Sequence, residues 1–146
     1  MITCLFNLTT LLMLSNQPVF HDSPNGLITV NITNVRSKEG QIRLNVFKDE
    51  ASFNSEKPYK IMHIPKNELA DGKLTANVQL PNGTFGIAVL DDENSNEKMD
   101  YTVMMPKEGF GFSNFYLTGL SRPKFDKFKF AVSDNSFAVV IKMKYM

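Results

Sequence analysis

The chain has 146 residues, of which 42% are hydrophobic and 21% are charged, and its formal net charge is +1. This length and apolar fraction suit one globular domain with a hydrophobic core and exclude a disordered chain. The near-neutral charge argues against a nucleic-acid partner, because such binders usually carry a basic excess. The single cysteine, Cys4, excludes an intrachain disulfide, so packing has to stabilise the fold.

The first 26 residues differ in composition from the rest of the chain. A short apolar stretch from Leu5 to Leu14 is followed by polar, turn-prone residues from Ser15 to Gly26. The stretch has the size of a signal-peptide core and is too short to span a membrane. We therefore predict a signal peptide or disordered leader over 1–26, a single domain over 27–146, and export to the periplasm, cell envelope or medium. The alternative is an apolar strand or helix packed on the domain.

From Leu27 onward, apolar residues recur at every second position, which is typical of half-buried strands. Strands are predicted over 28–32 and 42–46, and a turn between them predicts a first hairpin. The polar segment that follows has room for one helical turn around 51–53. A weaker strand is predicted over 59–64.

Two further hairpins are predicted in the second half of the chain. One joins 74–80 to 85–89 through Pro81-Asn82-Gly83, where Asn and Gly accept positive φ at little cost. The other joins 128–132 to 137–145. Short strands linked by such turns predict an all-β fold, a single antiparallel Greek-key β-sandwich of about seven strands.

An acidic loop, residues 91–100, follows the strand predicted over 85–89. It holds five carboxylates and one lysine, Lys98. Oxygen-bearing side chains stand at alternate positions, as in calcium loops: Asp92, Asn94, Asn96 and Asp100. Lys98 would add its backbone carbonyl, and Glu108 would complete a weak Ca²⁺ site with a Kd of about 10⁻⁴–10⁻³ M. The alternative is a solvated loop whose Asp and Asn side chains cap its own backbone.

The segment after the acidic loop alternates glycine and phenylalanine and has two interpretations. In the first, Phe110 and Phe112 plug one end of the sandwich, and the glycines allow close backbone approach. In the second, the segment is an aromatic binding loop formed by Phe110, Phe112, Ser113 and Asn114. Ser113 does not fit a nucleophile elbow, because Phe115 replaces the second glycine of Gly-x-Ser-x-Gly. The sequence assigns no catalytic residues.

Basic residues gather towards the C-terminus: Arg122, Lys124, Lys127, Lys129, Lys142 and Lys144. The lysines alternate with apolar residues, so they are expected to share the outer face of the last hairpin. Such a face keeps a sheet edge soluble. The alternative is contact with anionic lipid or polysaccharide.

Two motifs together resemble one protein family. The acidic loop and the run Met105-Pro-Lys-Glu-Gly-Phe-Gly-Phe-Ser-Asn114, followed by Pro123-Lys-Phe125 and the last strand, are similar to the exported bacterial family known as domain of unknown function 2141. The resemblance implies a signal peptide, an envelope or secreted location, and a small sandwich of the transthyretin-like or carboxypeptidase-regulatory kind. It implies no known activity. This chain has Asp91 where the family has His, and Ser95 and Glu97 where it has Gly.

These observations lead to two functional hypotheses. The first is a non-enzymatic binding or structural module that contacts an envelope component or polysaccharide. The second is a hydrolase that acts on envelope carbohydrate or peptide through the loop carboxylates. A cleft lined by Asp91, Glu108 and aromatic residues would favour the hydrolase, and a solvated loop would favour the binding module.

Overall fold

The computed structural model describes residues 25–119 and 121–146, which are mostly β-strand, so the predicted all-β class is confirmed. The expected leader lies outside the described residues except for Asn25 and Gly26, which already belong to the first strand. In the described part of the chain, no helix is long and apolar enough to cross a membrane.

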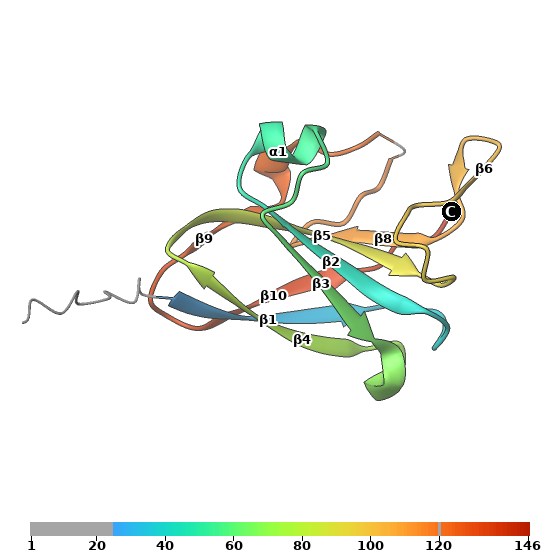
Figure 1. The fold of residues 1–146 in the computed structure, drawn as a ribbon, viewed down its shortest axis with the longest axis horizontal. Helices are drawn as coiled ribbons and strands as arrows, with labels where there is room; N and C mark the ends of the chain where they lie inside the picture. Colours follow the sequence, from blue (N-terminus) through green and yellow to red (C-terminus); the bar gives the residue numbers. More distant parts are fainter. Residues whose placement is uncertain (1–24, 120) are drawn as a thin grey trace, which may run out of the picture.

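The strands form two main sheets and one small hairpin (Figure 1). The three-stranded sheet has the order β10 (Phe137–Lys142), β1 (Asn25–Thr33) and β4 (Leu74–Pro81). The five-stranded sheet has the order β3 (Lys60–Pro65), β2 (Gln41–Phe47), β5 (Gly83–Asp92) and β8 (Gly109–Phe112), and β9 (Lys129–Val132) pairs with the first part of β5. The hairpin consists of β6 (Tyr101–Thr102) and β7 (Met105–Pro106).

The main core lies between the two sheets and contains the apolar residues of the period-two pattern. Most strands of the two main sheets contribute alternate side chains to it. Fully buried members come from both sheets: Ile28, Val30, Ile32, Val78, Val139 and Ile141 from the first, and Ile42, Leu44, Val46 and Ile87 from the second. The alternation in the sequence therefore identified the buried faces.

All three predicted hairpins are wrong, because the two strands of each belong to different sheets. β1 pairs with β4 and β10, β2 pairs with β3 and β5, and β9 pairs with β5. The turns carry the chain across the core, so the apolar faces of the two strands meet instead of lying side by side. In addition, β1 and β10 run parallel, with Ile28 opposite Phe137 and Ile32 opposite Ile141.

The expected common basic face is also wrong, since β9 and β10 are in different sheets. Lys129 lies in β9 and pairs with Asp126, whereas Lys142 lies in β10. Lys144 donates to the carbonyls of Leu117 and Gly119. The basic residues are therefore distributed over separate surfaces.

A second, aromatic cluster covers part of the outer face of the five-stranded sheet: Phe47, Phe53, Phe112, Phe125 and Phe128. Phe53 is the buried residue of α1 (Glu50–Asn54), and its ring lies 4.9 Å from that of Phe128. Asp49 caps α1 by accepting the N–H of Ser52 at 2.7 Å. Two 3₁₀ turns, η1 (Lys66–Glu68) and η2 (Phe125–Lys127), complete the described elements.

Candidate functional site

A groove of about 400 Å³ lies on the outer face of the five-stranded sheet, next to the aromatic cluster. Its floor follows the strand register in two rows: Arg43 lies opposite Leu90, which lies opposite Phe110, and Asn45 lies opposite Ala88, which lies opposite Phe112. α1 borders one part of the groove and the β6–β7 hairpin another. Both elements lie on the same side of the sheet in Figure 1.

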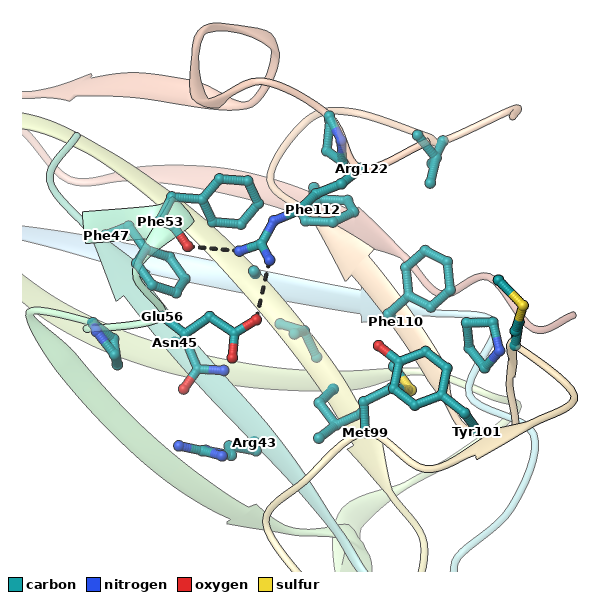
Figure 2. A pocket seen from close by; sticks show the side chains of 18 residues that line it. Arg43, Asn45, Phe47, Phe53, Glu56, Met99, Tyr101, Phe110, Phe112 and Arg122 are labelled. Carbon is teal, nitrogen blue, oxygen red and sulfur yellow. Dashed lines mark hydrogen bonds and ion pairs between the residues drawn. The ribbon is translucent and has the colours of Figure 1, made fainter. Parts of the chain in front are cut away.

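The walls of the groove are largely apolar and aromatic. Besides the floor, they include Phe47, Phe53, Pro58, Met99, Tyr101, Met104, Pro106, Leu117 and Pro123. Arg122 stacks on the Phe53 ring at 4.0 Å, donates to the Phe53 carbonyl at 2.6 Å and pairs with Glu56 at 3.1 Å (Figure 2). The charges of Arg122 and Glu56 are therefore matched, and they fix this wall in place.

Two polar atoms in the groove residues are buried without a hydrogen-bond partner among the described residues, Arg43 Nε and Asn45 Oδ1. The Nη1 atom of Arg43 donates to the Glu97 carbonyl, which ties its guanidinium to the acidic loop. A buried polar atom without a partner costs about 1–3 kcal/mol. Because neither atom is exposed, a ligand that accepts from Nε and donates to Oδ1 would recover this free energy only after the two side chains rotate towards the groove.

The tip of the β6–β7 hairpin exposes large apolar side chains beside the groove. Val103 is 91% exposed and Met104 is 93% exposed, and Tyr101 and Met105 are also exposed. The φ angles of Val103 and Met104 are 46° and 67°, as in a type I′ turn, where Asn and Gly are normal. A β-branched residue in this conformation is unusual. The tip therefore combines an exposed apolar surface with a strained backbone.

The acidic loop is held together by its own side chains. Asp92 is fully buried, and its carboxylate accepts the N–H groups of Asn96 at 2.9 Å and Glu97 at 3.0 Å. Asn94 Oδ1 accepts the Asn96 N–H, and Asn96 Oδ1 accepts the Lys98 N–H. These are the local capping bonds expected for a solvated loop.

The remaining predicted calcium ligands lie close to one another. Asp100 accepts the side-chain amides of Asn94 at 2.6 Å and Asn96 at 3.1 Å. Glu108 returns to the loop, where its carboxylate accepts the N–H groups of Glu93 at 3.1 Å and Asp100 at 3.3 Å. Burial, together with the charges of Asp100 and Asp92, raises the pKa of Glu108. In the described residues, no three His, Cys, Asp or Glu side chains are arranged to hold a metal ion.

The three departures from the family pattern have visible structural consequences. Ser95 and Glu97 adopt left-handed φ angles of 57° and 64°, a conformation that glycine adopts readily. Asp91 is fully buried and forms an ion pair with buried Lys66. Burial and the hydrogen bond to Asp91 raise the pKa of Tyr145. These contacts anchor the base of the acidic loop.

The four residues of the predicted binding loop do not form one site in the structure. Phe110 and Phe112 line the groove on the outer sheet face and do not plug a sandwich end. Ser113 Oγ donates to the Phe128 carbonyl at 2.6 Å and accepts the Ile87 N–H at 3.0 Å, which makes it a buried structural residue. Asn114 exchanges two hydrogen bonds with Val140. Neither Ser113 nor Asn114 lines the groove.

Sequence reasoning missed Arg43, Asn45 and Arg122 as groove residues. On β2 the two polar residues alternate with core residues, as on any solvated sheet face. One signal was present, because Phe47 follows Val46 directly and both are buried, which breaks the alternation. The other was the apolar run Val103-Met104-Met105 shortly after the acidic loop.

The fold and the site define an all-β protein with an apolar groove on the outer face of one sheet. The profile of the uncharacterised family conserved in bacteria, domain of unknown function 2141, matches residues 30–139. The chain belongs to this family, as its two motifs predicted. No curated protein and no solved structure matches it.

Proposed function

We propose that this protein is a non-enzymatic binding module of the cell envelope and that the groove is its ligand site. The observation that carries the proposal is the pair of buried atoms without partners, Arg43 Nε and Asn45 Oδ1, within aromatic walls. Ligand sites typically combine apolar walls with a few convergent polar groups. Rotation of these two buried side chains towards the groove would present one donor and one acceptor to a ligand.

The positions of the carboxylates support binding over hydrolysis. Hydrolysis of a glycosidic bond usually needs two carboxylates about 5–10 Å apart that face the substrate. Among the groove residues the only carboxylate is Glu56, which is paired with Arg122. The carboxylates of Asp92 and Glu108 accept backbone N–H groups of the acidic loop itself, and that of Asp100 accepts the side-chain amides of Asn94 and Asn96. Their hydrogen bonds account for the shape of the loop.

Export is part of the proposal and rests on the apolar stretch from Leu5 to Leu14 and on the family. The full chain, produced in a bacterial host, is expected in the periplasmic fraction with a mass that lacks the leader. The unprocessed mass in the cytosolic fraction alone would contradict export.

Weak calcium binding at the acidic loop is a second proposal. Asn94, Asp100 and Glu108 line a small hollow of about 220 Å³, together with Arg36, Glu39, Glu93 and Lys107. A cation beside Asp100 and Glu108 would relieve the repulsion between these two carboxylates. Calcium at ten times its Kd would stabilise the protein by about 1.4 kcal/mol. Thermal unfolding with EGTA, calcium and magnesium measures this, and Asp100→Asn is expected to abolish the response. No calcium-specific shift at about 10 mM, above the expected Kd range, would contradict it.

The groove itself is tested by NMR titration of the ¹⁵N-labelled full chain with one probe of each ligand class. The probes are a capped apolar peptide, chitotriose and decanoate. The proposed function predicts that at least one of them shifts amide signals within 43–47, 86–91 and 109–112 in a saturable manner. No shift with any of the three would contradict it.

A further inference from the structure

We propose that the groove and the tip of the β6–β7 hairpin together bind one extended, apolar segment of a partner polypeptide. This inference rests on the proposed function of the groove and names its ligand class. It follows from the extent of the apolar surface, the polar atoms of the floor, the charge balance and the conformation of the tip.

The apolar surface extends beyond the groove. Met104 lines the groove and is also 93% exposed, and Val103 beside it is 91% exposed. A small ligand within the groove would leave both side chains in water. A polypeptide segment that runs along the groove and past the tip would cover them, and exposed apolar patches of this kind mark interaction sites.

The polar atoms of the floor match the chemistry of a peptide backbone. Arg43 and Asn45 are two positions apart on β2, so their side chains leave the same sheet face roughly 7 Å apart. An extended peptide repeats its carbonyls and N–H groups with the same period. Once the two side chains rotate towards the groove, a carbonyl can accept from Arg43 Nε and a nearby N–H can donate to Asn45 Oδ1. A fatty-acid chain has no donor for Asn45 Oδ1.

The walls and the charges of the groove restrict the class of ligand further. The walls are formed largely by Phe, Met, Leu and Pro side chains, which suit bulky apolar side chains better than sugar hydroxyls. The carboxylate of Glu56 is engaged with Arg122, so Arg43 is the unmatched charge of the groove. A neutral or acidic segment therefore fits, and a basic one is disfavoured.

The conformation of the tip gives an independent argument. Asn followed by Gly would suit the positive φ angles of Val103 and Met104, so the apolar pair costs stability in the free protein. The exposed side chains of this pair do not offset that cost by packing against other described residues. Contact with a partner would give the pair a role that an Asn-Gly turn cannot supply.

The test uses the ¹⁵N-labelled full chain and the capped peptide Leu-Ser-Phe-Ser-Leu. The peptide is expected to shift amide signals within 43–47, 86–91, 101–106 and 109–112, whereas chitotriose and decanoate leave them unchanged. The double variant Val103→Asn with Met104→Gly is expected to bind at least tenfold more weakly and to unfold at the same or a higher urea concentration. The matched control, Leu27→Asn with Val140→Asn, removes exposed apolar side chains from β1 and β10 and should bind normally.

The outcomes separate this inference from the proposed function. Chitotriose or decanoate in the groove without peptide binding would overturn the polypeptide ligand and leave the groove as a binding site. Peptide binding that is unchanged in the tip variant would overturn the role of the tip, and with it the inference. No response to any probe would overturn both.

Discussion

The Tyr145 hydroxyl donates to Asp91 Oδ2 at 2.5 Å and so links the residues after β10 to the end of β5. The same hydroxyl accepts the Arg36 N–H at 3.1 Å, and the Arg36 guanidinium stacks on the Tyr145 ring at 4.5 Å. Arg36 also holds Glu93 through two hydrogen bonds. The base of the acidic loop is thus tied to the opposite sheet by one network.

Removal of the Tyr145 hydroxyl is expected to weaken this network. Tyr145→Phe keeps the ring, leaves Asp91 Oδ2 without this donor while the ion pair with Lys66 remains, and leaves the Arg36 N–H without its acceptor. The expected loss is about 1–3 kcal/mol in the free energy of unfolding, measured in urea. Tyr116→Phe, at an exposed position, is the control and should change little. Equal stability of the two variants would show that the hydroxyl has no structural role.

The buried pair of Lys66 and Asp91 predicts an asymmetric mutational response. Lys66→Met leaves the Asp91 carboxylate buried without its countercharge and should cost about 3–5 kcal/mol. Lys66→Met combined with Asp91→Leu removes both charges and should recover part of this loss. Urea unfolding of the two variants provides the comparison. A double variant that is less stable than Lys66→Met would contradict the prediction.

Glu93 predicts a specific pH dependence. The hydrogen bond from Arg36 lowers the pKa of Glu93 below its usual 4.5. Because the folded pKa is lower than the unfolded one, the stabilisation is complete above about pH 4.5 and is lost as the pH falls through the folded pKa. Glu93→Gln is therefore expected to cost about 1 kcal/mol at pH 7 and less at pH 3.

The control for Glu93 is Glu68→Gln, at an exposed position on η1. Its unfolding free energy should follow that of the unaltered protein at every pH. If the deficit of Glu93→Gln were the same at pH 3 and pH 7, the ion pair with Arg36 would not be its source.

The left-handed residues of the acidic loop predict a stabilising change. Ser95→Gly with Glu97→Gly should raise the unfolding free energy by about 1 kcal/mol per position, because glycine adopts positive φ without a side-chain clash. Lys98→Gly, at a neighbouring residue that does not have positive φ, should lower it. Thermal unfolding measures both effects. A less stable double glycine variant would show that the side chains of Ser95 and Glu97 hold the loop.

The sequence predicted the positions of most strands correctly but not which strands pair with each other. Alternation identified the buried residues of β1 and β2, such as Ile28 and Leu44, because it depends on which face is buried. It could not assign pairing, since strands that face each other across a core show the same alternation as strands of one hairpin. The groove could not be predicted from the sequence for a related reason. Arg43 and Asn45 line a groove only because residues of α1 and of the β6–β7 hairpin, which are distant in sequence, form its borders.

For the acidic loop, the sequence predicted the roles of several individual residues. The alternate spacing of Asp92, Asn94 and Asn96 predicted both cation ligands and backbone caps, and the structure shows the capping bonds. The return of Glu108 to the loop was also foreseen. The pairing of Asp91 with Lys66 was not, because it joins the ends of β5 and η1, which are distant in sequence.

The Asn45→Leu variant, measured for both stability and binding, tests whether the groove is a ligand site. If Asn45 serves to bind a ligand and not to stabilise the fold, its replacement by leucine should leave the urea midpoint unchanged or raise it. The reason is that the variant removes a buried acceptor without a partner. The same variant should lose the NMR response to the capped peptide. Retained binding, or a loss of stability above about 1 kcal/mol, would show that Asn45 serves the fold and not a ligand.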